Sequence, residues 1–555
     1  MRELLSSTDW KWDFILNLSE SDYPVKRVER LIEFLSANRN LNFVKSHGRE
    51  VQRFIQKQGL DKSFVECDTH MWRIGDRALP WGIQIDGGSD WIALSKDFVS
   101  YVASKTPDNL VKGLFTVFKY TLLPAESFFH TVLRNSRFCG TYIDNNLHVT
   151  NWKRKLGCKC QYKHVVDWCG CSPNDFKPED WPRIINTEPR QLFFARKFEP
   201  IINQEIILQL EAWLYDNVDF ELIFNSRSYW HNIYHHLDLG TVTDDALLTI
   251  ASSVARIISK SLSGNNCTID PITVLEITSH HVRDNYKNTL VLFAINSSNE
   301  RAQLEASFKP KTLLSLNKVN NVTFKLQKMS VASEYDQKEQ ISRNFARVLG
   351  PYSEPVLVYD FLPLQNFSTK NNVSFLWFDP AAHLADVSEV PLDKSTLSGH
   401  SKPMLRQPLL PGLWSIKIIF RNDFIAELKF LILPLEYFSG NSISPSQVRF
   451  VHSGSNSYRD FSTQWDKYLF PYNEQDKLER LSLSNSKRFG SDLREWIDSF
   501  VTKYYDIGEI CVSDKLNNIC GQELRMCNLT DWSSVAPDPK SNVNSLSGGA
   551  NRFYT

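Results

Sequence analysis

Three short stretches of the chain carry side chains whose types and spacing suit chemistry on a bound ligand. GGSDW (87–91) places Asp90 and Trp91 directly after two glycines, which let the backbone turn sharply and approach a ligand closely. A carboxylate there suits sugar hydroxyls, and an indole can stack on a sugar face. The structural alternative is a turn in which the aspartate only caps the backbone.

LLPAESFF (122–129) places Glu126 in the first turn of a helix that we expect to begin at Pro124. A glutamate there can act as a general base if it lies beside a hydroxyl and has a pKa near the working pH. The alternative is structural, because the helix dipole favours a glutamate in the first turn without any function.

FFARKFE (193–199) places Arg196 and Lys197 between phenylalanines. Two adjacent cations with aromatic walls suit a diphosphate, since arginine supplies a planar donor fork and lysine a compact charge. A solvated charge pair is the alternative. The chain contains no Asp-x-Asp motif, which sugar-nucleotide enzymes often use to hold a divalent ion on the diphosphate. The two cations are therefore candidates to replace the metal, although the sequence leaves a divalent ion open.

KLGCKCQYKHVVDWCGCS (155–172) contains two Cys-x-Cys pairs. In an antiparallel hairpin a single register pairs Cys158 with Cys171 and Cys160 with Cys169, because residue numbers in such pairs have a constant sum. Directly facing positions are close enough for disulfides. Zinc is the alternative, but zinc knuckles prefer two to four residues between their cysteines. We favour disulfides over zinc, and both over free thiols.

Cys267, Cys511, Cys520 and Cys527 could form two further disulfides, but spacing does not define the partners. Disulfides imply the secretory route, and seven Asn-x-Ser/Thr sequons agree weakly with it. The chain has no apolar run of about 18 residues and no signal peptide at its start. Lys plus Arg and Asp plus Glu each number 63, so the formal net charge is zero and we expect no nucleic-acid partner.

Hydrophobic periodicity predicts an α/β part followed by a β-rich part. The predicted strands lie at 13–19, 42–48 and 83–95, the last with an internal glycine turn, and the predicted helices at 28–38, 50–58, 96–104 and 125–136. Residues 201–260, including His235 and His236, should be mostly helical. From about 270 to 450, short β-rich runs with turns between them suggest a sandwich-like domain, and a late helix should cover 493–505.

Taken together, these stretches resemble the protein O-xylosyltransferases of glycosyltransferase family 14. The similarity runs from residue 9 to about 541 and rests on the following segments: DFILNLSESDYPVKR, NFVKSHGRE, ECDTHMWRIGD, GGSDW, YTLLPAESFFHTVL, NWKRKLGCKCQYKHVVDWCGCSPNDFKP, FFARKFE, VLGPYSEPV, GLWSIKI and WSSVAPDPKS. The cysteine segment and the appended β domain distinguish this family from the related branching N-acetylglucosaminyltransferases.

The resemblance implies a GT-A catalytic domain that transfers xylose from UDP-xylose, with inversion, to a serine of a proteoglycan core protein. The acceptor serine precedes glycine near acidic residues, and the product starts heparan sulfate and chondroitin sulfate chains. By match to the family's motifs, Glu126 is the base, Ser89, Asp90, Ser172, Arg196 and Lys197 bind the donor, and Arg154 and Trp91 contact the acceptor. No cofactor is required for the diphosphate. The resemblance further implies the disulfides Cys267–Cys520 and Cys511–Cys527, with Cys67 and Cys139 left unpaired.

Family members begin with a cytoplasmic tail, a membrane anchor, a stem and the first part of the GT-A domain, and this chain starts after them. We therefore expect residues 1–200 to be the C-terminal part of a GT-A domain, 201–269 a mainly helical connection, 270–540 the β-rich domain and 541–555 a disordered tail. The complete protein should be a type II membrane protein of the Golgi lumen. The alternatives are a branching β-1,6-N-acetylglucosaminyltransferase, a non-catalytic remnant that binds only the acceptor, and a cytosolic zinc protein.

Overall fold

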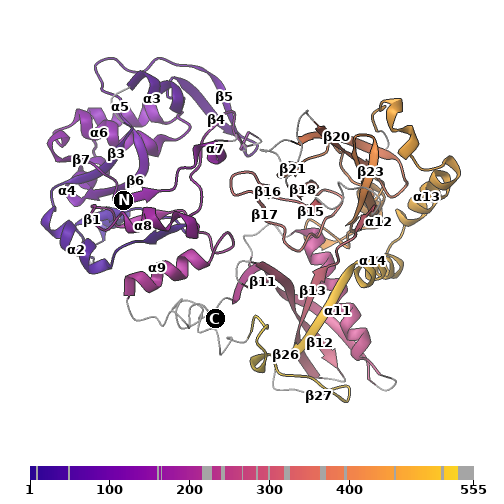
Figure 1. Ribbon diagram of the computed structural model, residues 1–555. Coiled ribbons are helices and arrows are strands. Elements are labelled where there is room, and N and C mark those ends of the chain that lie inside the picture. Colours follow the sequence, from indigo (N-terminus) through magenta and orange to yellow (C-terminus); the bar gives the residue numbers. More distant parts are fainter. Residues whose placement is uncertain are drawn as a thin grey trace. The chain divides into compact units, whose positions relative to one another are not determined.

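The computed structural model forms two compact units. Unit 1 comprises Met1–Ile223 and Gln337–Glu339, and unit 2 comprises Phe224–Asp336 and Gln340–Thr555 (Figure 1). The structure describes residues 1–7, 10–47, 51–158, 160, 162–163, 165–215, 228–238, 244–264, 267–282, 285–297, 300–317, 326–362, 371–392, 397–455, 458–513 and 518–535. Within these ranges no helix combines the length and apolarity needed to cross a membrane.

Unit 1 is built on a four-stranded sheet in the order β1-β6-β3-β7. Strands β3 and β7 are parallel and the other neighbours are antiparallel. The strands of unit 1 are β1 (Phe14–Leu16), β2 (Asp22–Pro24), β3 (Asn42–Ser46), β4 (Lys62–Cys67), β5 (His70–Asp76), β6 (Gly88–Ser95), β7 (Tyr142–Asp144), β8 (His148–Thr150) and β9 (Phe194–Arg196). Its helices are α1 (Arg2–Ser6), α2 (Val28–Ala37), α3 (Val51–Gln58), α4 (Lys96–Val102), α5 (Asn109–Phe118), η1 (Pro124–Glu126), α6 (Phe128–Asn135), η2 (Cys139–Thr141), α7 (Arg154–Gly157), η3 (Pro178–Asp180), α8 (Trp181–Ile185) and α9 (Glu205–Tyr215).

Helices cover both faces of this sheet because successive strand residues point to opposite sides. On one face, Val44, Ile92 and Leu94 pack with apolar residues of α4, α5 and α6. On the other face, Phe43 and Ala93 pack against α2. Ser95 ends β6 and caps α4 by accepting a hydrogen bond from the Phe98 N–H, so the chain turns directly from strand into helix. Unit 1 is therefore a layered α/β structure.

A second sheet of unit 1, in the order β2-β9-β8, carries the FFARKFE stretch. Strand β9 lies in the middle, antiparallel to β2 and parallel to β8. Ala195 on β9 packs into a buried cluster with Val25, Phe176 and residues of α9. The hairpin β4–β5 lies apart from both sheets.

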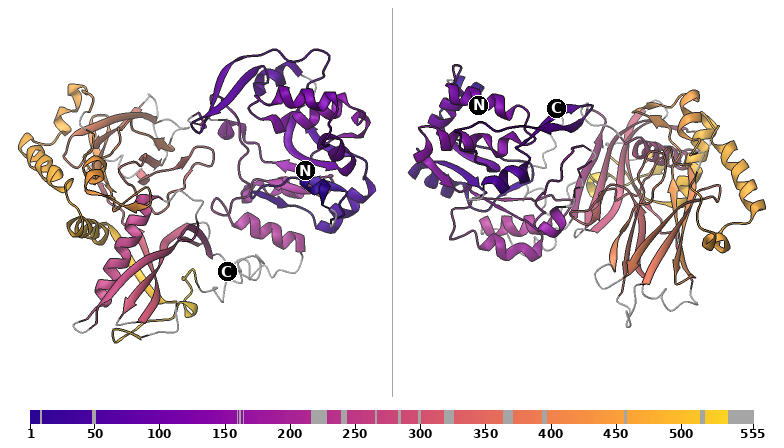
Figure 2. Two further views of the ribbon diagram at one scale, coloured as in Figure 1. Left: turned by 180° about the vertical axis from the view of Figure 1, so that it is seen from behind. Right: turned by 90° about the horizontal axis from the view of Figure 1, so that it is seen from above.

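Unit 2 contains a five-stranded antiparallel sheet in the order β10-β11-β12-β13-β26. Helices α11 and α14 pack on it through a large apolar cluster, and Figures 1 and 2 show α11 lying along the sheet. Asp244 starts α11 by accepting hydrogen bonds from the N–H groups of Ala246 and Leu247. The bounds are β10 (Ser228–His235), β11 (Ile269–Val282), β12 (Asn285–Ser297), β13 (Glu300–Pro310), β26 (Tyr505–Val512), α11 (Asp245–Leu262), α12 (Pro445–Val451), α13 (Tyr472–Asn485) and α14 (Ser491–Tyr504).

Two further antiparallel sheets, β14-β23-β22-β19-β20 and β15-β18-β21, share one buried cluster in unit 2. Leu357 and Tyr359 of β18 enter it from one sheet, and Phe375 and Trp377 of β19 enter it from the other. Their bounds are β14 (Leu314–Leu316), β15 (Leu326–Ala332), β18 (Val356–Phe361), β19 (Asn371–Phe378), β20 (Leu384–Leu392), β21 (Ser398–Ser401), β22 (Gly412–Phe420) and β23 (Asp423–Ile432). Short pairs complete the unit: β16 (Tyr335–Asp336) with β17 (Ile341–Ser342), β24 (Tyr437–Phe438) with β25 (Asn441–Ser442), and β27 (Asn518–Ile519) with β28 (Gln522–Glu523).

The elements differ from the predicted ones where tertiary contacts override the local pattern. The helix predicted over 125–136 is divided at Ser127 into η1 and α6, and only the second half of the strand pair predicted over 83–95 forms. The range 201–260, predicted to be mostly helical, contains the strand β10, which ends at His235. Helix α5 and the hairpin β4–β5 were not predicted, and the tail 541–555 lies outside the described residues.

Candidate active site

Glu126 ends the single turn of η1, which Pro124 begins and which contacts strand β6. Proline suits this first position because its fixed φ matches the turn. Glu126 is partly buried. Burial, and then the negative charge of Asp90, raises the pKa of Glu126 from its ordinary value of 4.5 to about 7. A carboxylate with such a pKa can exchange a proton near neutral pH, as a general base must.

Strand β6 presents Ser89, Asp90 and Trp91 next to this turn. Asn17 fixes the strand at this point, since its side chain donates to the Asp90 carbonyl over 3.0 Å and accepts from the Ile92 N–H over 2.9 Å. The Ser89 hydroxyl accepts a hydrogen bond from the Asn146 amide over 2.9 Å. The backbone around Asp90 is therefore held from both sides.

Gly88 is required by the packing of the sheet rather than by a ligand. A Cβ atom at this position would lie 1.8 Å from the carbonyl oxygen of Lys45 on β3, far inside contact distance. The register of β3 and β6 shifts at this place, next to the pairing of Ser46 with Gly88. We expected the two glycines to allow close approach to a ligand, but Gly88 instead allows β3 and β6 to approach each other closely.

Arg196 lies at the end of β9, held between an acid and an aromatic ring. Its register partner on β2 is Asp22, and the Arg196 Nε lies 3.8 Å from the Asp22 Oδ1. The guanidinium carbon lies 4.0 Å from the centre of the Trp91 ring, which is a cation–π contact. The Arg196 side chain is 14% exposed and that of Asp22 only 1%. Burial lowers the pKa of Arg196, and the carboxylates of Asp22 and Asp90 act in the opposite direction.

Trp91, which was predicted to contact the acceptor, packs against the guanidinium group of Arg196. In the described part of the chain its buried indole N–H has no hydrogen-bond partner. The negative charge of Asp90 raises the pKa of Glu126, and it also counteracts the lowering of the pKa of Arg196 by burial. The structure thus brings these three predicted residues into one site.

Lys197 follows Arg196, and the backbone of both residues is tied to the segment after the cysteine cluster. The Phe176 N–H donates to the Lys197 carbonyl over 2.8 Å, and the Asn151 N–H donates to the Arg196 carbonyl over 3.0 Å. Burial, and then the positive charge of Lys338, lowers the pKa of Lys197. The site thus places two partly buried cations side by side.

Ser172 begins the segment that leads to Phe176, and its N–H donates to the Gly157 carbonyl over 2.9 Å. A Cβ atom on Gly157 would lie 2.1 Å from the Ser172 carbonyl oxygen, so only glycine fits here. Arg154, the other predicted acceptor residue, starts helix α7, but its side chain is not among those described.

The four disulfides match the predicted pairs: Cys158–Cys171, Cys160–Cys169, Cys267–Cys520 and Cys511–Cys527. Cys67 and Cys139 are free and exposed, also as expected. The described residues between Cys158 and Cys171 belong to no strand, so there the structure does not show the β-hairpin from which the register of the first two disulfides was inferred. The pairing excludes zinc at these four cysteines.

Among the described residues, one group of three has ligand atoms close enough to hold a metal: Glu305, Cys511 and Cys527. The two sulfur atoms are joined in a disulfide, so they are not available as thiolates.

Several residues of the site were missed from the sequence: Asn17, Asp22, Asn146, Lys338 and Glu339. Asn17 and Asp22 belong to the quoted DFILNLSESDYPVKR stretch, and this resemblance was the only signal for them. The others act through contacts that no local spacing encodes.

Two family profiles match different parts of the chain. Residues 1–178 match the family described as Core-2/I-Branching enzyme, and residues 211–386 match Xylosyltransferase C terminal. The first match covers β6 and η1, and the second covers the first half of unit 2.

Relatives from insects and mammals align over nearly the whole chain. Xylosyltransferase oxt of Drosophila melanogaster is 48% identical over 558 residues, covering 98% of this chain and 63% of the relative. Xylosyltransferase 1 of Homo sapiens is 41% identical over 560 residues, covering 98% and 57%. Xylosyltransferase 2 of Mus musculus is 39% identical over 558 residues, covering 98% and 63%. The chain thus spans about three fifths of the length of these relatives.

Proposed function

The chain belongs to the xylosyltransferase family, and on this premise we propose that it transfers xylose from UDP-xylose to a serine of a proteoglycan core protein, with inversion. The observation that carries the proposal is the position of Glu126. Its partly buried carboxyl group has a pKa raised to about 7 and lies against the strand that bears Asp90. A general base that removes the proton of a serine hydroxyl needs a pKa near the working pH, and burial gives Glu126 such a pKa.

In the proposed reaction Glu126 removes the proton of the acceptor serine while its oxygen attacks the anomeric carbon of xylose. The bond from that carbon to the UDP oxygen breaks on the opposite side, so the configuration inverts. Arg196 and Lys197 stabilise the negative charge that develops on the departing diphosphate. They supply the positive charge that a divalent ion supplies in enzymes with an Asp-x-Asp motif, and a role for an added metal is left to experiment.

The other donor contacts are assigned to Asp90 and Ser89 for xylose and to Ser172 beside them. Trp91 and Arg154 remain the proposed acceptor contacts, for a Ser-Gly segment with acidic neighbours. Sugar chains of the heparan sulfate and chondroitin sulfate type would start on the product.

The finer fold assignments belong to the same proposal. Residues 1–200 are assigned to the C-terminal part of a GT-A domain, supported by the α/β layers and the branching-enzyme match. Residues 270–540 are assigned to a sandwich-like domain, supported by the core that two of its sheets share. The disulfides suggest the secretory pathway, and the Golgi lumen, with a type II membrane anchor, is proposed for the complete protein.

The test is release of UDP from UDP-xylose on a Ser-Gly peptide with acidic flanks, with the 555-residue chain expressed through the secretory pathway. We expect turnover with UDP-xylose and little with UDP-N-acetylglucosamine. Preference for UDP-N-acetylglucosamine would support the branching activity instead. Peptide binding without turnover of either donor would support the non-catalytic alternative.

A further inference from the structure

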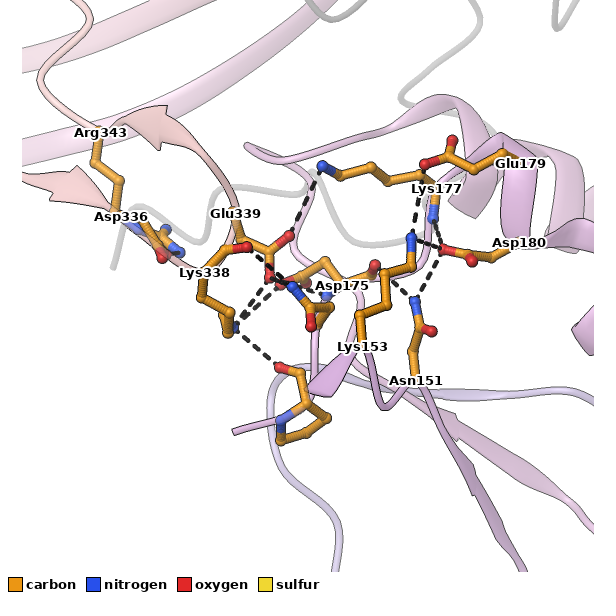
Figure 3. Close-up of polar contacts among 12 residues, drawn as sticks. Asn151, Lys153, Asp175, Lys177, Glu179, Asp180, Asp336, Lys338, Glu339 and Arg343 are labelled. Carbon is orange, nitrogen blue, oxygen red and sulfur yellow. Dashed lines mark hydrogen bonds and ion pairs between the residues drawn. The ribbon is translucent and has the colours of Figure 1, made fainter. Parts of the chain in front are cut away.

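The segment 337–339 belongs to unit 1, although its neighbours in the sequence, β16 and β17, belong to unit 2. Figure 3 shows Lys338 and Glu339 pointing toward Asp175, three residues after the proposed donor contact Ser172. These side chains are almost completely buried: Lys338 is 3% exposed, and Glu339 and Asp175 are each 1% exposed. Three charged groups at this depth are costly unless they neutralise and hydrogen-bond one another.

Hydrogen bonds from this segment hold the backbone of residues 173–175. The Lys338 ammonium donates to the Pro173 carbonyl over 3.1 Å, and the Glu339 Oε1 accepts from the Asp175 N–H over 3.1 Å. The side-chain amide of Asn174 donates to the Lys338 carbonyl over 3.0 Å and to the Glu339 Oε1 over 3.3 Å.

The held backbone leads directly to the two proposed diphosphate cations. The Asn174 N–H donates to the Asn151 carbonyl over 2.9 Å, and the Asn151 N–H donates in turn to the Arg196 carbonyl. The Phe176 N–H donates to the Lys197 carbonyl over 2.8 Å. Two hydrogen-bonded paths thus run from segment 337–339 to Arg196 and Lys197.

The charged side chains of segment 337–339 also interact with charged residues of the proposed donor site. Lys338 lies close enough to Lys197 to lower the pKa of its ammonium group, so the two lysines repel each other. The Lys338 Nζ lies 3.2 Å from the Glu339 Oε1 and 3.6 Å from the Asp175 Oδ2. Burial, and then the negative charges of Glu199 and Glu339, raises the pKa of Asp175 to about 7.

We propose that Lys338 and Glu339 are positioning residues of the donor site, which fix residues 173–176 and through them the backbone of Arg196 and Lys197. This inference rests on the proposed function, since it assumes that the two cations bind the diphosphate. It also assigns a role to the β-rich part of the sequence, which supplies the segment that completes the site of unit 1.

The experiment compares Glu339→Ala with Glu339→Gln in the 555-residue chain. Glutamine keeps the acceptor oxygen for the Asp175 N–H and the Asn174 amide, whereas alanine removes it. We expect calorimetry to show UDP binding weakened about 10-fold or more in Glu339→Ala, because small misplacements of binding groups are costly, and nearly normal binding in Glu339→Gln. The KM for UDP-xylose should rise in the alanine variant while the KM for the acceptor peptide stays unchanged.

The matched control is Asp336→Ala, which breaks the neighbouring ion pair between Asp336 and Arg343 (3.0 Å) and leaves the donor network intact (Figure 3). It should bind UDP normally. If Glu339→Ala does not fold, Glu339→Asp replaces it. Aspartate keeps the negative charge, but its shorter side chain moves the oxygen away from the Asp175 N–H and the Asn174 amide, so the same weakening of UDP binding is expected.

Unchanged UDP affinity in the folded alanine or aspartate variant would overturn the inference, and so would equal losses in the glutamine and alanine variants. A general loss of folded protein with a normal KM for UDP-xylose would also count against it. If the unchanged chain does not bind UDP at all, the proposed function fails as well. UDP binding by the unchanged chain with no effect of the variants rejects only the inference.

Discussion

Replacing Glu126 with glutamine should remove turnover and at the same time stabilise the fold above neutral pH. The pKa of Glu126 is raised from 4.5 to about 7, mainly by burial. At 1.36 kcal/mol per pKa unit, ionising this group in the folded state costs up to about 3 kcal/mol. The unfolded chain loses the proton near pH 4.5, so the fold loses stability as pH rises from 4.5 to 7, and the cost is constant above that. Glutamine carries no such cost.

The assay measures the free energy of unfolding of both proteins by urea at pH 4 and pH 8. We expect the free energy of unfolding of Glu126→Gln to equal that of the unchanged chain at pH 4 and to exceed it by about 1–3 kcal/mol at pH 8. The gain is below the full value because burying the glutamine amide has a desolvation cost of its own. Turnover should fall roughly 100- to 10,000-fold, the usual contribution of a general base, while UDP still binds.

Glu66→Gln is the matched control, because Glu66 is exposed on β4 of the same unit. It should change neither turnover nor stability. Turnover within 10-fold of normal in Glu126→Gln would refute the role as base. A stability difference that does not grow between pH 4 and pH 8 would show that the Glu126 carboxyl group does not have a raised pKa in the folded chain.

Further predictions concern pH, the donor cations, the histidines and the thiols. Turnover should rise with pH through about 7, because Glu126 is active only when deprotonated, and a flat kcat from pH 6 to pH 8 would contradict this. Arg196→Ala should weaken UDP binding about 10-fold or more, since a buried bidentate donor is lost, and unchanged calorimetric affinity would reject the assignment. Burial lowers the pKa of His281 and His452 to about 4, so the unfolded chain takes up protons first as pH falls below 6.5. The free energy of unfolding should therefore drop by about 2 kcal/mol for each histidine between pH 6.5 and pH 5, and equal urea midpoints would exclude it. Denatured but unreduced protein should titrate two thiols, and a count near ten would disprove the disulfides.

Local spacing was enough to predict several features of the site. Two Cys-x-Cys pairs allow a single nested pairing in one antiparallel register, and the disulfides have it although the described residues between them form no strand. Pro124 followed by Glu126 indicated a helical turn bearing a carboxylate, and the turn forms as η1. The short apolar runs within 42–48 and 83–95 indicated strands, and β3 and β6 form there. Such features depend on residues a few positions apart, whose relative geometry the backbone determines.

Only the tertiary structure decided how the site is held together. Trp91, assigned to the acceptor, lies on β6 and makes its cation–π contact with Arg196, which lies on β9 of the other sheet. Asp22 is opposite Arg196 because β2 pairs with β9. Glu339 contacts Asn174 across 165 positions of sequence. No periodicity encodes such contacts, since closing a loop of that length has an entropy cost that hardly depends on which residues meet. Burial and complementary charge in the folded chain select the partners, and they also set the pKa of Glu126 on which the proposed chemistry depends.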